Sequence, residues 1–289
     1  MTVRAIAGGA IAIAGLAAAI GCAPLNYTHP TEPNLVRCCV PPPAASDSLL
    51  VVSYNIRFAR EVPGALAILE GTPELAAPDV VLLQEMDAVG TRRIANALGM
   101  NVVYYPAVHH PQSHHDSGNA ILTRWPVLRH RKLILPHRGR LGHTQRIGVL
   151  AVLAVGGREV TVASIHLATP VENSPGQRHD QVDAIVDLVA PADMAVVGGD
   201  MNDPWLARRF VQHGFACPTR GHGATNVHGL ALDQVLVHRR TGSVAGDSLA
   251  ERADALAPAG VVPGDGFVSD HWPIWTRIAL RVEGEKASP

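Results

Sequence analysis

The sequence predicts one α/β domain over residues 48–282. Short apolar runs of strand length alternate with segments of helical spacing, polar side chains follow directly where the runs stop, and no change of composition divides the region. The chain of 289 residues is 47% hydrophobic and 17% charged, which provides for a full core and argues against a disordered or fibrous protein. Because the formal net charge is -1, attraction to nucleic acid or anionic membranes requires a local patch.

Residues 1–21 have the features of a signal peptide. Arg4 precedes an apolar run of roughly 16 residues that ends at Ile20, shorter than the roughly 20 needed to span a membrane. Gly21 before Cys22 resembles a bacterial lipoprotein cleavage site, which predicts that Cys22 is lipidated and becomes the mature N-terminus. A plain secretory signal and a retained anchor are the alternatives. We therefore expect an exported protein, anchored by lipid to a membrane of the bacterial cell envelope, or otherwise secreted or periplasmic.

Residues 22–47 are predicted to form a Pro-rich tether, because they contain three consecutive prolines at 41–43 and show no hydrophobic periodicity. If Cys22 carries lipid, three cysteines remain. Cys217 would then pair with Cys38 or Cys39 in an oxidising envelope, and unpaired thiols are the alternative. Residues 283–289 are predicted to be a tail.

The first half of the domain predicts a strand, a helix and a second strand. The strand covers residues 49–54, and leucines at helical spacing place the helix at about 64–76. A second apolar run, over residues 79–83, ends at Gln84-Glu85. This unit of about 30 residues is the size expected of a crossover connection between parallel strands.

The second half repeats this pattern. A strand is predicted over residues 160–165, an amphipathic helix over 178–189, and a strand over 194–197 that leads into Gly198-Gly199-Asp200. Two further strands are predicted at 232–237 and 272–278. Arg146 precedes another strand-like run, residues 147–152, and we expect its side chain to point into a cleft at the strand ends.

Polar side chains stand at the ends of these strands. In α/β folds, strand ends that open on one edge of a sheet are where sites converge. Taken singly, each such residue is more often a turn or a helix cap, but a set of six in order indicates a site. Five segments follow a strand and one begins a strand; they hold Asn55, Glu85, His166, Asp200 with Asn202, Asp270 with His271, and Asp233.

The chemistry of these residue types fits phosphate esters. Glu85 and Asn55 supply hard oxygen ligands, which suit Mg²⁺ or Mn²⁺. Asp200 and Asn202 lie two residues apart, so that a carboxylate can reach a water molecule while an amide reaches a phosphoryl oxygen. His271 supplies an imidazole that titrates near neutral pH.

This ordered set resembles the endonuclease/exonuclease/phosphatase superfamily over about residues 50–279. The resemblance includes the segment 118–127 and the residues Arg178-His179-Asp180-Gln181 that open the helix after His166. It implies a four-layer α-β-β-α sandwich, with two facing mixed β-sheets and an active site at the sheet edges. It also implies a hydrolase that uses a divalent metal ion, Mg²⁺ or Mn²⁺.

The resemblance further implies a role for each residue. Glu85 and Asn55 would bind the metal, with Asp270 near a second or shared metal position. Asp200 would activate or orient the attacking water, and Asn202 and His166 would hold phosphate oxygens. His271, oriented by Asp233, would bind the phosphate or act as the base; the choice of base and the number of metals stay open. Asn119 and Arg146 complete the set as candidate substrate-binding residues.

The nature of the substrate depends on a basic stretch, Arg124–Arg146, which contains no Asp or Glu. It would track a nucleic-acid backbone or grip a phosphorylated headgroup, and a solvated face is the alternative. We expect a nuclease-like phosphodiesterase of the cell envelope. A phospholipid (sphingomyelinase-like) or inositol-phosphate hydrolase is the main alternative, although aromatic residues make up only 4% and no apolar hairpin is evident. A non-catalytic binding module is disfavoured because no charged site residue is missing. No protein partner is indicated.

Overall fold

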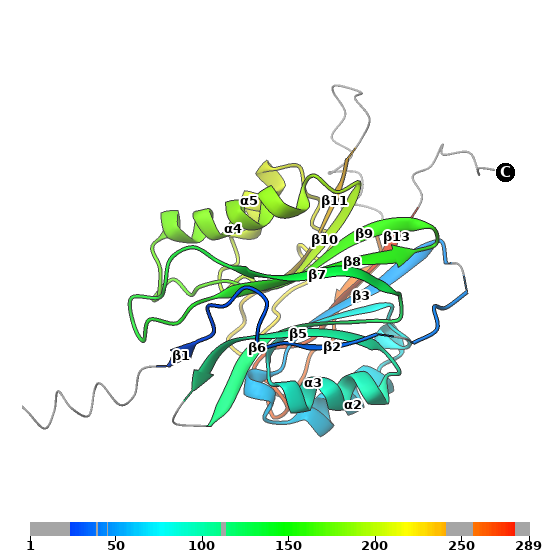
Figure 1. The fold of residues 1–289 in the computed structure, drawn as a ribbon, viewed down its shortest axis with the longest axis horizontal. Helices are drawn as coiled ribbons and strands as arrows, with labels where there is room; N and C mark the ends of the chain where they lie inside the picture. The colour runs from blue at the N-terminus through cyan, green and yellow to red at the C-terminus, as the bar shows by residue number, and fades with distance from the viewer. Residues whose placement is uncertain (1–23, 39, 45, 111–113, 241–256, 281–289) are drawn as a thin grey trace, which may run out of the picture.

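The computed structural model describes residues 24–38, 40–44, 46–110, 114–240 and 257–280. Two β-sheets face each other; helices α2 (Val62–Gly71) and α3 (Ala88–Ala97) cover one, and α4 (Pro175–Val189) and α5 (Ala207–Gln212) cover the other (Figure 1). This arrangement confirms the predicted four-layer sandwich. The predicted signal peptide with Cys22, the residue Cys39 and the predicted tail lie outside the described residues.

The first sheet has eight strands, in the order β1-β5-β6-β4-β3-β13-β12, with β2 also paired to β5. β3 and β4 run parallel because α2 forms the crossover between them, and the other pairs are antiparallel. The strands are β1 (Leu25–Asn26), β2 (Leu35–Arg37), β3 (Ser48–Asn55), β4 (Val80–Met86), β5 (Asn101–His110), β6 (His115–Thr123), β12 (Ala259–Val261) and β13 (Ile274–Ala279).

The second sheet has five strands, in the order β11-β10-β9-β8-β7. β9 and β10 are parallel because α4 connects them, and the remaining pairs are antiparallel. The helix begins with a capping box between Ser174 and Gln177. The strands are β7 (Val127–Ile134), β8 (Ile147–Val155), β9 (Arg158–His166), β10 (Met194–Asp200) and β11 (Asp233–Arg239).

Three apolar clusters hold the layers together. The central one lies between the two sheets and includes Val51, Leu82, Val149 and Val196, all fully buried. The other two fill the spaces between each sheet and its helices. Burying one such side chain stabilises the fold by about 1.5–3 kcal/mol, so the sandwich is a rigid support for the loops at its edges.

Part of the predicted tether belongs to the first sheet. Leu25 of β1 lies opposite His109 and Val36 of β2 lies opposite Val103, both on β5. Residues 25–26 and 35–37 are therefore not a separate tether, and here the sequence-based boundary at residue 48 is wrong. The physical reason is the edge of β5, whose backbone N–H and C=O groups require partners that periodicity within residues 22–47 does not reveal.

The described chain begins and ends at opposite ends of the sandwich. β1, near the start of the described chain, lies toward the left in Figure 1, and β13, near its end, lies toward the right. Among the described residues, no helix is long and apolar enough to cross a membrane.

Candidate active site

Strand pairing brings the predicted site residues to one level of the second sheet. In the parallel pair of β9 and β10, Asp200 lies opposite His166. In the antiparallel pair of β10 and β11, the same Asp200 lies opposite Asp233. Three side chains far apart in the sequence therefore meet at the end of β10.

Two glycines bring the end of β10 close to its neighbours. A Cβ at Gly199, where φ is +151°, would lie 1.9 Å from the carbonyl oxygen of Ile165, and a Cβ at Gly198 would lie 2.6 Å from Leu82 of the facing sheet. Glycine is therefore required at position 199, where the clash is with backbone, and a side chain at position 198 would displace the end of the Leu82 side chain. The close approach places Asp200 against the first sheet, where Asn55 Nδ2 donates to Asp200 Oδ2 at 3.1 Å.

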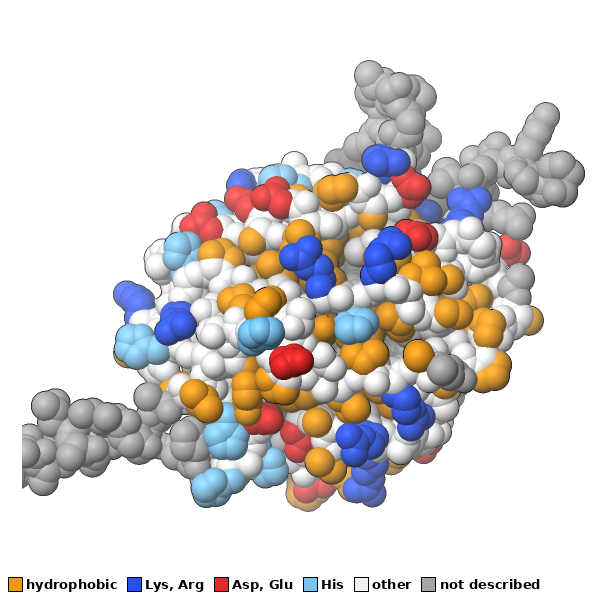
Figure 2. Space-filling view, in the orientation of Figure 1, with side chains coloured by type: hydrophobic (Ala, Val, Ile, Leu, Met, Phe, Trp, Pro, Cys, Tyr) orange, Lys and Arg blue, Asp and Glu red, His pale blue; other side chains and the backbone are white. Residues whose placement is uncertain are grey.

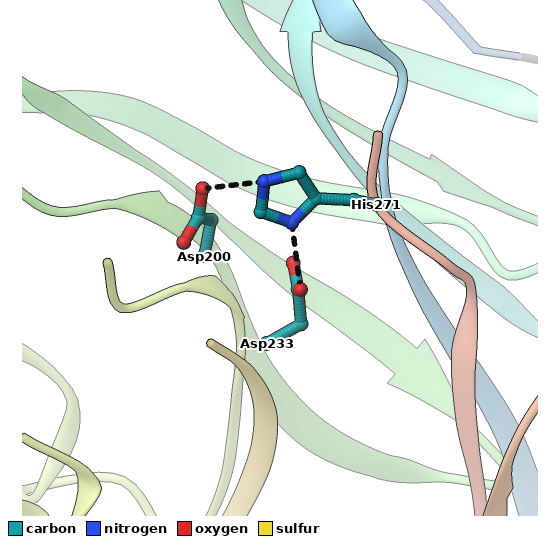
Figure 3. Close-up of side chains that lie close together, drawn as sticks. All are labelled: Asp200, Asp233 and His271. Carbon is teal, nitrogen blue, oxygen red and sulfur yellow. Dashed lines mark hydrogen bonds and ion pairs between the residues drawn. The ribbon is translucent and has the colours of Figure 1, made fainter. Parts of the chain in front are cut away.

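His271 lies between two carboxylates (Figure 3). Its Nδ1 is 2.8 Å from Asp233 Oδ2, and its Nε2 is 3.6 Å from Asp200 Oδ2. The Thr225 hydroxyl donates to the same Asp233 oxygen at 2.6 Å. Because a carboxylate can only accept hydrogen bonds, Nδ1 carries a proton, and a proton on Nε2 as well would make the ring an imidazolium that faces Asp200.

The electrostatics of this group agree with that protonation. Burial alone would lower the pKa of His271, but the charges of Asp233 and Asp200 raise the pKa to about 10. Burial, together with Asp233, raises the pKa of Asp200 to about 7, although His271 opposes the shift. At neutral pH the histidine is therefore charged, while the aspartate is close to its titration point.

His166 has a different environment on the opposite side of Asp200. Its Nε2 is 2.9 Å from Arg146 Nη1 and 3.5 Å from Asp200 Oδ2, and Arg146 Nη2 forms an ion pair with Glu172 at 2.8 Å. A guanidinium group only donates, so His166 Nε2 accepts and the ring is neutral. Burial and the Arg146 charge lower the pKa of His166 well below its usual value.

Glu85 is aimed into the site by an irregularity in β4. The register with β6 shifts between Leu83 and Met86, and Glu85 has a φ of +57°. Its carboxylate accepts from the Phe58 backbone N–H at 3.1 Å and from Asn55 Nδ2 at 3.4 Å. Neither donor carries a charge, and burial raises the pKa of Glu85.

Two neighbouring sets of residues are candidates to hold a divalent metal. Asp200, Asp233 and His271 offer ligand atoms that all lie within 4.8 Å of one another. The imidazolium form of His271 has no lone pair for a metal, however. Glu85, which is half-buried, and the buried Asn55 present oxygen atoms without a bonded cationic side chain, which is the donor chemistry that hard divalent ions prefer. Asp270 lies 3.6 Å from Arg57 Nε at the same edge.

A cavity of about 130 Å³ adjoins this group. Asn119 also lines it, but both of its amide N–H groups donate to backbone carbonyls, those of Ile147 and Ser164, at 3.1 Å. The Asn119 side chain therefore ties the two sheets together, and its NH₂ group does not face a substrate as a substrate-binding role would require. Among the other residues that line the cavity are Phe58, Glu85, His110, Arg146, His166 and Glu172.

Asn202 lies two residues after the end of β10, with a φ of +53°. Its backbone N–H donates to Asp200 Oδ1 at 2.7 Å, and its amide donates to the Leu167 carbonyl at 2.9 Å. It therefore orients the Asp200 carboxylate and keeps one amide hydrogen for another acceptor.

Sequence reasoning missed Glu172, which neutralises Arg146, and Thr225, which holds Asp233. It also missed Ser269, whose hydroxyl donates to the Asn55 carbonyl at 2.7 Å. All three are single polar residues in loops, and nothing in the local sequence distinguishes them. Their roles depend on partners from other segments of the chain.

The basic stretch Arg124–Arg146 does not form one charged surface. Arg129 is paired with Glu159 at 2.6 Å, and Lys132 is buried, with its ammonium group 2.8 Å from the Tyr27 carbonyl. β7 carries these residues away from the site edge. Only the loop at its end, residues 135–146, lies beside the cavity.

Comparison with known proteins agrees with this geometry. The model of the Endonuclease/Exonuclease/phosphatase family matches residues 52–271, and the chain belongs to this family. Members are usually hydrolases of phosphoester bonds that depend on a divalent metal. No curated protein matches the sequence.

Solved structures share the fold at low sequence identity. An endonuclease/exonuclease/phosphatase from Bacteroides vulgatus is 12% identical, with a TM-score of 0.63 over 82% of this chain and 100% of that chain. One from Beutenbergia cavernae is 20% identical, with a TM-score of 0.61 over 81% of this chain and 72% of that chain. TDP2 from D. rerio, complexed with single strand DNA product, is 16% identical, with a TM-score of 0.59 over 80% of this chain and 99% of that chain.

Proposed function

We propose that the protein is a nuclease-like phosphodiesterase of the bacterial cell envelope, which cleaves by direct attack of water on phosphorus. The observation that carries the proposal is the arrangement around Asp200. His271 Nδ1 donates to Asp233, and the raised pKa of His271, about 10, keeps Nε2 protonated beside Asp200, so the ring has no lone pair to accept a proton from water. Asp200 is the remaining group at the centre of the site, and we assign it as the base that takes that proton.

The other residues bind and orient the phosphate. The His271 imidazolium and the Arg146 guanidinium each present positive charge where negative charge develops on the phosphoryl oxygens. His166, neutral and hydrogen-bonded to Arg146, and the second amide hydrogen of Asn202 complete the set. Asp233 and Glu172 act through His271 and Arg146, respectively, by holding those cations in position.

Glu85 and Asn55 are the residues that would hold the metal, with Asp270 at the same edge. A divalent ion, Mg²⁺ or Mn²⁺, supplies Lewis-acid polarisation of the phosphoryl group when it is bound. The Glu85 carboxylate, whose hydrogen bonds come from neutral groups, supports this assignment.

Charge in the cavity favours a diester over a monoester. Among the residues that line it, Arg146 is the one Arg or Lys, and two carboxylates, those of Glu85 and Glu172, line it as well. A diester carries one negative charge and a monoester carries up to two, so the diester is the better match. Phospholipid hydrolysis is a second candidate, favoured by the exposed Leu141 on the loop beside the cavity.

The test is hydrolysis by the full chain, first with EDTA and then with added Mg²⁺ or Mn²⁺. Plasmid DNA, bis-p-nitrophenyl phosphate and sphingomyelin vesicles are assayed side by side. Metal-dependent nicking of plasmid supports a nuclease, and headgroup release without nicking supports the phospholipid candidate. Absence of hydrolysis on all three substrates contradicts the proposal and favours a binding module.

Glu85→Gln tests the metal assignment. We expect it to lower kcat on bis-p-nitrophenyl phosphate by at least about 100-fold, the effect of removing a charge-stabilising group. Glu159→Gln is the matched control, since Glu159 is exposed and pairs with Arg129 outside the cavity. Retention of activity by Glu85→Gln would show that the metal binds elsewhere.

A further inference from the structure

The loop between β7 and β8, residues 135–146, combines exposed apolar and basic side chains. Leu141 is 65% exposed, and Arg138, Arg140 and His143 are exposed around it. The loop contains no Asp or Glu. It extends from the left end of the sandwich in Figure 1, and Figure 2 shows basic and histidine side chains gathered at that end.

Two neighbouring segments add exposed apolar side chains to this loop. Val171 is 64% exposed, and its segment is tied to the loop because the Arg140 N–H donates to the Glu172 carbonyl at 2.9 Å. Leu25 of β1 is 62% exposed. The adjacent Asn26 donates to the His143 carbonyl at 2.8 Å and accepts from the Gln145 N–H at 2.7 Å. We call Leu25, Leu141, Val171, Arg138 and Arg140 the rim.

The rim borders the mouth of the cavity. Gln145, Arg146 and Glu172 line the cavity, and each belongs to one of the segments that carry the rim. A partner bound to the rim is therefore held next to the proposed phosphate-binding residues.

The charges of the rim arginines are available to a partner. Arg138 Nε donates to Gln145 Oε1 at 3.3 Å. Arg140 Nη2 donates to the Val171 carbonyl, also at 3.3 Å. Both guanidinium groups therefore use neutral oxygen atoms in these contacts.

Two carboxylates contact the same loop, and each is engaged with another cationic or basic group. Asp180 pairs with His137 at 2.7 Å, and Glu172 pairs with Arg146 at 2.8 Å. Neither of these contacts neutralises the rim arginines. An anionic surface is the complement of such a loop.

The predicted lipid-carrying residue, Cys22, is close in the sequence to Leu25 of the rim. The described residues begin at Pro24, directly before Leu25 of the rim. Cys22 lies two residues earlier, a span of at most about 7 Å of extended chain. A lipid on Cys22 would hold this end of the sandwich, and not the opposite end, against a bilayer.

We propose that the rim is a membrane-contacting surface whose partner is an anionic lipid bilayer. The three apolar side chains enter the boundary between headgroups and acyl chains, and the two arginines lie among the anionic headgroups. The mouth of the cavity then faces the membrane surface. This proposal goes beyond the proposed function and does not depend on catalysis.

Quenching of tryptophan fluorescence by lipid tests the proposal in the full chain. Leu141→Trp places an indole at the rim. Leu128→Trp is the control, because Leu128 is exposed on β7, about 20 Å back along the strand from its end at Ile134. Each variant is bound to vesicles of phosphatidylglycerol and brominated phosphatidylcholine, and the emission of the unsubstituted chain is subtracted.

We expect the added emission of Leu141→Trp to fall by about half or more, because an interfacial side chain reaches brominated acyl chains. The added emission of Leu128→Trp should stay unchanged. Arg138→Gln combined with Arg140→Gln should reduce the quenching in the Leu141→Trp background, and so should high salt. Both leucines are exposed, so circular dichroism should show an unchanged fold.

Equal quenching in the two variants would overturn the proposal, since a chain held only by its leader or its lipid gives that result. A change in Leu141→Trp emission with plasmid DNA but not with vesicles would assign the rim to nucleic acid instead. Hydrolysis of bis-p-nitrophenyl phosphate is measured separately. A failure of the rim proposal is therefore distinguishable from a failure of the proposed function.

Discussion

Two histidines flank Asp200 at nearly the same distance and yet carry different charges. His166 Nε2 lies 3.5 Å from Asp200 Oδ2, and His271 Nε2 lies 3.6 Å from the same atom. His166 receives a hydrogen bond from Arg146, whereas His271 donates to Asp233. Burial lowers the pKa of both rings, but only His271 has a carboxylate partner strong enough to reverse the effect.

The difference teaches that the protonation of a buried histidine depends on its hydrogen-bond partners more than on burial itself. Asp200 therefore stands between a neutral ring and a charged ring. The charged ring cannot take a proton from water, and for this reason we propose the aspartate as the base. Each of the following predictions tests one part of this difference between the neutral His166 and the charged His271.

Asp200→Asn should have the largest effect, because it removes the proposed base. We expect kcat on bis-p-nitrophenyl phosphate to fall by about 10³-fold or more, within the range that general-base groups contribute. Asp187→Asn, at an exposed position of α4, is the control. Activity within about tenfold of the unsubstituted protein would assign the proton transfer to another group.

Asp233→Asn should have a smaller effect, because it leaves the base in place and weakens the charge on His271. We expect kcat/KM at pH 8 to fall by about 100-fold, the low end of what positioned electrostatic groups supply. NMR titration should show the pKa of His271 falling from about 10 toward its usual value while the pKa of His166 stays low. An unchanged His271 titration would mean that Asp200 alone sustains its charge.

The pH profile should show the smallest effect, about tenfold per pH unit on the acid side. Asp200 acts as a carboxylate and its raised pKa is about 7, so kcat/KM should rise with pH up to about 7 and then level off. It should fall again as His271 loses its proton near pH 10. A profile that stays flat between pH 5 and about 7 would contradict the assigned base.

The site around Asp200 was predictable only in part from the sequence. Apolar runs that stop at Asn55, His166 and Asp200 predicted both the strands and their meeting at one edge, because strand ends in an α/β sandwich share that edge. The pairing of Asp233 with His271 was implied by the family resemblance. The proposed base was not, because that assignment depends on the groups that surround each histidine in the folded chain.

Other features could not be predicted from the sequence, and the reasons are physical. Glu172 forms its ion pair with Arg146 only when the β7–β8 loop and the segment before α4 lie together in the folded chain. The short strands β1 and β2 have no periodicity of their own, since the open edge of β5 determines where they pair. Asn119 lies in a segment that matches the family, yet its side chain is used in joining the sheets.

The pairing of β1 also determines how mechanical load would enter the molecule. Tension on the chain ahead of Pro24 would fall first on a strand of two residues, Leu25 and Asn26. Asn26 is hydrogen-bonded to the loop that ends at Arg146, so the same tension would reach the cavity before it reached the core. The two-residue strand β1 is therefore linked by hydrogen bonds to a loop that borders the cavity.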